Sequence, residues 1–212
     1  MGKLIVKNMI LGEVGTNCYI VYDEDSKDAA VIDPADRGDL IAAYIEENSL
    51  KLSAIYLTHG HFDHMSGADE LRSLTGVKLY CPEGDLAVIE DPELNVSLLF
   101  TGRAVSCKAD EPLTEGSVIK IGTHEGKVLS TPGHTPGGVC FYFKEDGILF
   151  SGDTVFEGSV GRTDLPGCSG SSLMKSIKTK ILPLPDDVEI YPGHGGMTTI
   201  GDEKKYNPYF GL

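Results

Sequence analysis

The stretch "LTHGHFDHMSG", residues 57–67, concentrates side chains that bind metals. It places His59, His61, Asp63 and His64 within six positions, although the 212-residue chain has only six histidines. Imidazole nitrogens and carboxylate oxygens are ligands of Zn²⁺ and of other divalent first-row metals. Residues two apart in an extended segment project from the same face, so His59 and His61 should point the same way. The stretch therefore predicts a metal site.

Three further candidates follow apolar, strand-like segments. "KVLSTPG" leads to His134, "ILFSG" to Asp153 and "VEIYPG" to His194. Strand ends are rigid and the loops beyond them can hold irregular side chains, which is where sites are built. Glycines that suit close backbone approach flank the candidates, at positions 60, 67, 133, 152, 193 and 195. We expect all seven candidate ligands to converge.

Seven ligands are more than one ion needs, but they suit two ions. Three histidines on one ion, an aspartate and two histidines on the other, and a shared carboxylate account for the set. Two ions about 3.5–4 Å apart can hold one bridging hydroxide. The spacing leaves open which ligand serves which ion, and zinc, iron and manganese all accept these donors. His124, in the polar turn "GTHEGK", is interpreted as an ordinary surface or core residue.

The elements that must position these residues are strands with helices between and after them. Helical spacing predicts helices over 38–50, 66–76 and 171–182, with Ser66 as a cap and Gly76 at the exit. Residues 82–115 are broken by Pro, Gly and acidic residues and suggest a loop or lid with a short helix over 85–90. Strands are expected over 4–7, 17–22, 29–33, 52–58, 77–81, 117–121, 126–131, 137–143, 147–153 and 188–195. Their clustering in both halves predicts two packed sheets with helices outside.

Composition limits the function classes. The net charge of −14 and the absence of a basic run argue against nucleic acid or an anionic membrane as a partner. Five widely spaced cysteines without C-x-x-C predict neither disulfides nor a cysteine zinc site and suit a reducing cytosol. The N-terminus lacks the features of a signal peptide, and no apolar run approaches membrane-spanning length. One domain over 1–212 and a cytoplasmic protein are expected, with the oligomeric state open.

The run T-H-G-H-F-D-H resembles the H-x-H-x-D-H signature of the metallo-β-lactamase superfamily. "TPGHTPGG", "LFSGDTVFEGSVGRTD" and "YPGHG" follow in that family's order, and Asp33 ends an early strand. The resemblance covers essentially the whole chain. It implies an αββα sandwich, an α/β (α+β) fold of two mixed sheets with helices outside and the metals at one edge. The chain most resembles short glyoxalase II-like hydrolases of hydroxyacylglutathione thioesters, without the C-terminal helical domain of longer members.

The resemblance also implies roles for individual residues. His59, His61 and His134 would bind the first metal, and Asp63, His64 and His194 the second. Asp153 would bridge both. Asp33 would orient a ligand by hydrogen bonding, or else cap a turn before Pro34. Arg162 is a candidate for binding a substrate carboxylate, with a loop-fixing pair to Asp164 as the alternative.

The mechanism expected from the resemblance is hydrolysis of a small-molecule thioester such as S-lactoylglutathione. Water bound to the metals, with zinc favoured, loses a proton near pH 7 and the hydroxide attacks the carbonyl. Asp63 is a candidate proton carrier, and Asp153 acts through the metals. A thiolate leaves with little help, because free thiols have a pKa near 8.5.

Two alternatives remain open. Persulfide dioxygenases resemble this chain too, and they use one iron held by two histidines and one aspartate, here His59, His134 and Asp153. The other alternative is a non-catalytic metal-binding protein, although such proteins usually lose ligands. A secreted β-lactamase and an RNA-processing nuclease fit less well, because the chain lacks an export signal and is acidic.

Overall fold

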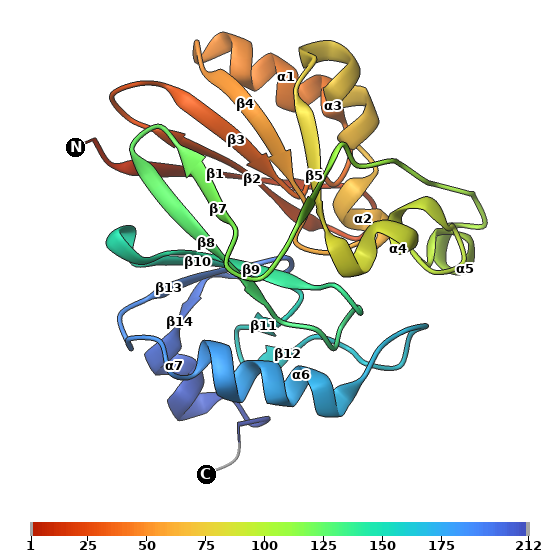
Figure 1. Cartoon of the computed structure of the whole chain (residues 1–212), viewed down its shortest axis with the longest axis vertical. Coiled ribbons are helices and arrows are strands. Elements are labelled where there is room, and N and C mark those ends of the chain that lie inside the picture. Colours follow the sequence, from red (N-terminus) through yellow and green to blue (C-terminus); the bar gives the residue numbers. More distant parts are fainter. Residues whose placement is uncertain (1, 211–212) are drawn as a thin grey trace.

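The computed structural model describes residues 2–210 and shows two six-stranded sheets packed face to face. Helices α1 (Gly38–Glu47) and α3 (Ala68–Thr75) lie on the outer face of the first sheet. Helices α6 (Gly170–Ser176) and α7 (Ile200–Tyr206) lie on the outer side of the second (Figure 1). This arrangement confirms the expected αββα sandwich.

The first sheet is built from the N-terminal half of the chain, in the order β1-β2-β3-β4-β5-β6. Strands β1, β2 and β3 pair antiparallel, whereas β3, β4, β5 and β6 run parallel. The parallel strands therefore end at the same edge. The strands are β1 Leu4–Leu11, β2 Thr16–Asp23, β3 Asp28–Ile32, β4 Lys51–Tyr56, β5 Lys78–Pro82 and β6 Glu111–Leu113.

The second sheet is built from the C-terminal half, in the order β14-β13-β10-β9-β8-β7. Only β10 and β13 pair in parallel, so their carboxyl ends also share an edge. A separate two-stranded ribbon, β11 Val155–Phe156 with β12 Ser159–Val160, follows β10. The sheet strands are β7 Val118–Ile121, β8 His124–Ser130, β9 Val139–Phe143, β10 Ile148–Gly152, β13 Glu189–Pro192 and β14 Thr198–Thr199.

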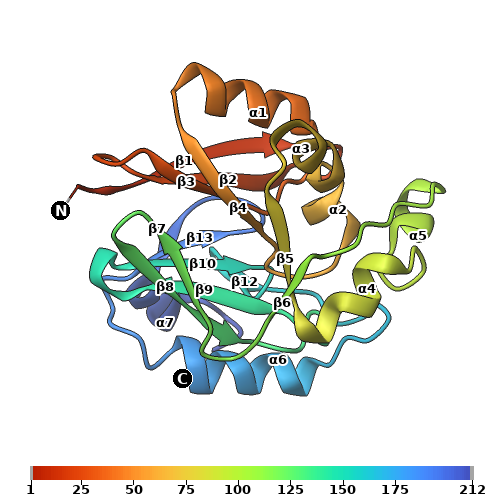
Figure 2. The ribbon, with the colours of Figure 1, turned by 45° about the horizontal axis from the view of Figure 1, so that its top comes forward.

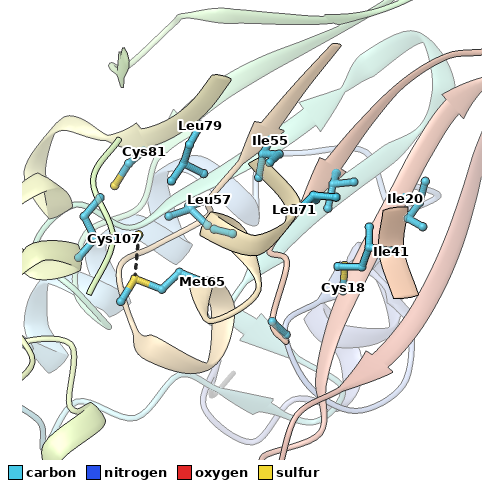
Figure 3. Close-up of a cluster of buried hydrophobic side chains, with 14 of the residues drawn as sticks. Cys18, Ile20, Ile41, Ile55, Leu57, Met65, Leu71, Leu79, Cys81 and Cys107 are labelled. Atoms are coloured by element: carbon cyan, nitrogen blue, oxygen red, sulfur yellow. Dashed lines mark hydrogen bonds between the residues drawn. The ribbon is translucent and has the colours of Figure 1, made fainter. Parts of the chain in front are cut away.

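The central strands are apolar along most of their length. Successive side chains of a strand point to opposite faces of the sheet, and both faces are buried here. In β3, Ala29 and Val31 face the helices while Ala30 and Ile32 face the second sheet. Figure 3 shows the helix-side core, in which Leu71 of α3 lies among side chains of β4 and β5. A third cluster joins α6 to the outer face of the second sheet. Burial of these faces holds the two sheets rigidly against each other.

A substitution at Phe141 tests how much packing between the two sheets contributes to stability. Its side chain is fully buried in β9, with its ring 5.9 Å from that of Tyr56 on the opposite sheet. We expect Phe141→Ala to lower the free energy of unfolding by about 3–5 kcal/mol, because the lost contacts leave a cavity. Urea unfolding measures this, and the half-exposed Val118→Ala serves as the control. A loss no larger than that of the control would contradict the packing.

The helix expected over 66–76 is confirmed as α3, but other details of the sequence-based expectations need correction. A further short helix, α2 (Phe62–Met65), precedes α3, and Ser66 does not cap α3, because its hydroxyl donates back to the Phe62 carbonyl. Gly76 does end α3, with φ of 73°. Residues 82–115 contain α4 (Leu86–Glu90), as expected, but also α5 (Ser97–Thr101) and β6. The terminal helix α7 was not predicted.

The loops beyond the strand ends gather at one edge of the sandwich. Helix α5 projects there from the body of the molecule (Figure 2). No helix within residues 2–210 is long and apolar enough to cross a membrane.

Candidate metal centre

The seven predicted ligands come together at this edge. Asp153 lies at the middle of the set: its Oδ2 is 3.4 Å from His134 Nε2 and 3.5 Å from His194 Nε2. Its Oδ1 is 3.4 Å from His64 Nε2. Donor atoms lie within 4.8 Å of one another in three groups: His59–His61–His134, His59–His64–Asp153 and Asp63–His64–His194.

Strand ends carry most of these residues, as the sequence indicated. His59 and His61 follow β4, while His134 follows β8. Asp153 and His194 follow the paired strands β10 and β13. The backbone at Gly193 passes so close that a Cβ there would overlap Asp153 Oδ1 and His64 Cε1. Glycine is therefore required where these two loops meet.

Asp33 fixes the orientation of two of the histidines. Its buried carboxylate accepts hydrogen bonds from His64 Nδ1 at 2.9 Å and from the Thr58 hydroxyl at 2.6 Å. Thr58 Oγ1 in turn lies 3.0 Å from His59 Nδ1. Since the Thr58 proton goes to Asp33, His59 Nδ1 must donate to Thr58. Both rings therefore carry a proton on Nδ1 and turn Nε2 towards the centre, which is the orientation that binding a metal through Nε2 requires.

His134 is oriented in the same manner by the backbone. Its Nδ1 donates to the Arg162 carbonyl at 2.8 Å, which leaves Nε2 as a lone pair. His61 Nδ1 lies 2.9 Å from that nitrogen. These hydrogen bonds at Nδ1 thus turn the Nε2 atoms of His59, His64 and His134 inward.

The electrostatics of the centre favour cations. Burial, with His134 adding to it, lowers the pKa of His61 to about 3, so this ring is neutral. Burial opposes the charged form of His64, but the carboxylates of Asp63, Asp153 and Asp33 raise its pKa well above the ordinary value. Burial also opposes ionisation of Asp63, yet His64, His194 and the hydrogen bond from Thr16 hold its pKa low. The centre therefore combines a neutral His61 with carboxylates whose negative charge attracts cations.

The donor set fits divalent metal ions. His59 Nε2, His64 Nε2 and Asp153 Oδ1 are buried without a hydrogen-bond partner among the described residues. A buried polar atom without a partner costs free energy that a ligand can offset. Facing donors of Asp63, His64, Asp153, His134 and His194 lie 3.2–3.6 Å apart. Zinc–nitrogen bonds of about 2.0–2.1 Å in a tetrahedron imply a spacing of about 3.3 Å.

Two supporting residues were missed by sequence reasoning. Thr16, at the start of β2, donates to Asp63 Oδ2 at 2.8 Å. Asp85, next to α4, accepts hydrogen bonds from Gly60 N, Thr135 Oγ1 and Gly137 N. Asp85 thereby links the loop of His59 and His61 to the loop of His134. Neither residue has a local sequence signal, since each acts on positions at least 25 residues away.

We expect Asp85→Ala to lower the free energy of unfolding by about 3 kcal/mol, because three buried donors lose their acceptor. Metal affinity should fall as well, since the two ligand loops are no longer held together. Chemical unfolding of the metal-free protein and chelator competition measure the two effects separately. Glu83→Ala, an exposed acidic residue of the same turn, is the matched control. Unchanged stability in Asp85→Ala would show that the loops need no such link.

The centre opens into a cleft of about 320 Å³, called here the metal cleft. Apart from the ligands, its lining is apolar except for Arg162. The Arg162 guanidinium donates two hydrogen bonds to Asp164, at 2.7 and 2.9 Å, and lies 5.7 Å from the Phe100 ring centre. The structure thus shows the loop-fixing pair, and a substrate contact by Arg162 stays a prediction. His124 lies elsewhere, buried beside Asp146.

This fold and site define the class. The chain belongs to the metallo-beta-lactamase superfamily, whose sequence model matches residues 11–194. It is a hydrolase of that superfamily with a histidine and aspartate cluster suited to metal ions.

Particular relatives show how similar this chain is to known members. It is 38% identical to the hydroxyacylglutathione hydrolase GloC of Haemophilus influenzae over 202 residues, 91% of this chain and 92% of GloC. The BLEG-1 B3 metallo-beta-lactamase has a TM-score of 0.93 and 39% identity, covering 98% of this chain and all of BLEG-1. TTHA1623, solved in a di-iron-bound form, has a TM-score of 0.86 and 36% identity, covering 96% of this chain and all of TTHA1623.

Proposed function

We propose that this protein is a binuclear-metal thioester hydrolase of the glyoxalase II type, acting on S-lactoylglutathione or a related acyl thioester. The observation that carries the proposal is the position of Asp153, whose carboxylate lies 3.4–3.5 Å from His64, His134 and His194 in a cleft whose lining beyond the ligands holds no general acid. His59, His61 and His134 would hold one ion. Asp63, His64 and His194 would hold the other, with Asp153 contacting both.

The metals supply the reactive chemistry. Divalent ions at such a site lower the pKa of bound water from 15.7 to about 7 and polarise the acyl oxygen. Zinc is proposed first, and iron is the main alternative, because TTHA1623 holds two iron ions. Manganese accepts the same ligands.

The protein residues hold the ligands and handle the proton. Asp33 and Thr58 keep His59 and His64 in the tautomers that leave Nε2 free. Asp63 faces the cleft and accepts a hydrogen bond from Thr16, which keeps one carboxylate oxygen engaged. We assign Asp63 the role of accepting the proton that the attacking water releases.

The residues that line the cleft indicate which kind of leaving group the site can release. Among the described cleft residues other than the ligands, only Arg162 is ionisable, and it stays protonated. No residue there can give a proton to a strongly basic leaving amine. A thiol with a pKa near 8.5 leaves as the thiolate without such help. The name of the GloC relative agrees with thioester chemistry.

The test measures metal content and turnover on one preparation. Protein loaded with zinc or iron under defined supply should hold close to two ions per chain and hydrolyse S-lactoylglutathione. A single iron with oxygen uptake on glutathione persulfide would instead show the mononuclear dioxygenase. Two ions without turnover of any thioester, lactam or persulfide would indicate a non-catalytic metal-binding protein.

A second candidate function is β-lactam hydrolysis, favoured by the similarity to BLEG-1. Opening the strained ring of a β-lactam needs less help with the leaving amine than hydrolysis of an ordinary amide does. A chromogenic cephalosporin assayed on the same metal-loaded samples compares the two activities. A kcat/KM above that for every thioester tested would place lactam hydrolysis first.

A further inference from the structure

The metal cleft adjoins a second groove of different chemistry. This groove, of about 230 Å³, shares Val14, Phe62 and Asp63 with the metal cleft. Its remaining lining includes Glu13, Asp36 and Arg103, so it carries charges of both signs. A substrate whose reactive carbonyl lies at the metals therefore meets an apolar surface in one direction and a polar one in the other.

The apolar surface is assembled from both halves of the chain. Val14, Phe62, Val96 and Phe100 come from the N-terminal half, and Phe156, Val160 and Leu165 from the C-terminal half. We call these seven residues the apolar wall. The rings of Phe62 and Phe100 stack with centres 6.2 Å apart. Val14 is 50% exposed and Phe100 51% exposed, so an apolar ligand would remove considerable surface from water.

The wall is held in position by buried polar contacts. Asn95, fully buried before α5, donates to the Val105 carbonyl at 2.8 Å and accepts from Ser97 N at 3.0 Å. Its own carbonyl accepts from Phe62 N at 3.1 Å. Val96 adopts a left-handed conformation with φ of 62°, which a β-branched residue rarely does. Strain of this kind persists where the surroundings impose it, commonly at functional sites.

Lactoyl is a poor match for this wall. It is small and carries a hydroxyl group, whereas the wall offers seven apolar side chains and the arginine beside it, Arg162, is already paired with Asp164. The polar groove suits the other end of a thioester, since peptide-like thiols carry both ammonium and carboxylate groups. Glu13 and Asp36 match the ammonium, and Arg103 matches a carboxylate.

We propose that the acyl group of the substrate lies against the apolar wall, and that the enzyme prefers aliphatic or aromatic acyl groups larger than lactoyl. The thiol carrier then extends over the polar groove. This inference rests on the proposed thioester hydrolysis and names its substrate class.

The first experiment is a series of S-acylglutathiones with lactoyl, butyryl, hexanoyl and phenylacetyl groups, assayed on the metal-loaded protein. We expect kcat/KM to rise about three- to fourfold for each buried methylene, until the wall is covered. Phe100→Ala should reduce this dependence and lower hexanoyl turnover at least tenfold more than lactoyl turnover. Leu99→Ala is the matched control, because Leu99 is the 68% exposed neighbour of Phe100 in α5 and does not line the metal cleft.

The possible outcomes test the acyl preference separately from the proposed thioester hydrolysis. Equal turnover of lactoyl and hexanoyl substrates, with Phe100→Ala lowering both alike, would overturn the acyl preference and leave thioester hydrolysis standing. A second series, with acetyl constant and the alkyl thiol lengthened, tests the orientation. A chain-length dependence in the thiol series alone would place the carrier on the wall and overturn the inference. Failure to hydrolyse any thioester would overturn the proposed function and this inference together.

Discussion

Replacing Asp153 by alanine should remove both activity and bound metal. We expect metal content to fall from about two ions to fewer than one per chain and kcat/KM for thioesters to fall at least about 10³-fold. The reason is the position of the carboxylate: Oδ2 faces His134 and His194, ligands of different proposed ions, while Oδ1 faces His64. Without it, each ion loses a ligand and the site loses a negative charge that offsets two cations.

Metal analysis and steady-state kinetics on the same sample measure this result. Asp186→Ala is the control, because that exposed aspartate pairs with Lys204 far from the cleft. Circular dichroism of the metal-free variant checks that the fold is retained. If Asp153→Ala kept two ions and full turnover, Asp153 would not be the bridging ligand.

Asp33→Ala should cause the second large loss, although Asp33 is not one of the proposed metal ligands. We expect metal affinity to fall by about 10–100-fold, the range found when hydrogen-bond partners of metal-binding histidines are removed. The carboxylate fixes His64 directly and His59 through Thr58, so one substitution releases two rings. Once released, each imidazole populates the tautomer that carries a proton on Nε2 and cannot bind a metal through that atom.

A graded series distinguishes orientation from simple stability. Thr58→Ala removes the hydroxyl that joins His59 to Asp33 but leaves the hydrogen bond between Asp33 and His64, so it should cost less metal affinity than Asp33→Ala. Thr58→Ser retains the hydroxyl and should restore most of the affinity. Chelator competition gives the affinities, and chemical unfolding of the metal-free proteins gives the stabilities. Equal metal affinities in Asp33→Ala and the wild type, with only the stability changed, would assign Asp33 a purely structural role.

The roles of Asp153 and Asp33 are not equally easy to predict from the sequence. Asp153 stands directly after an apolar strand and beside a glycine, a pattern that marks a site in the chain itself. Asp33 also ends a strand, but its sequence context suits a turn cap before Pro34 equally well. Only the folded chain shows His64 and Thr58 against its carboxylate.

The ligand candidates and the layered fold could both be predicted from the sequence. Metal chemistry restricts ligands to a few residue types, so seven histidines and aspartates, most of them directly after strands, are conspicuous. The buried strands are equally clear, because apolar runs such as "AAVI" in β3 have no stable place except between two layers. The same local logic failed at Ser66, whose hydroxyl bonds the preceding helical turn instead of capping the next helix.

The tertiary structure alone decided which residues support the ligands and which surface faces the substrate. Thr16 reaches Asp63 across 47 positions, and Asp85 reaches Gly137 across 52. Phe100 and Arg103 lie in a segment whose composition indicates only a broken loop, yet the buried Asn95 places that segment beside the metals. Candidate metal ligands are recognised by residue type, which can be read directly from the sequence. Hydrogen-bond partners and cleft walls depend on contacts between distant segments, which form only when the two sheets pack and bring their strand ends to one edge.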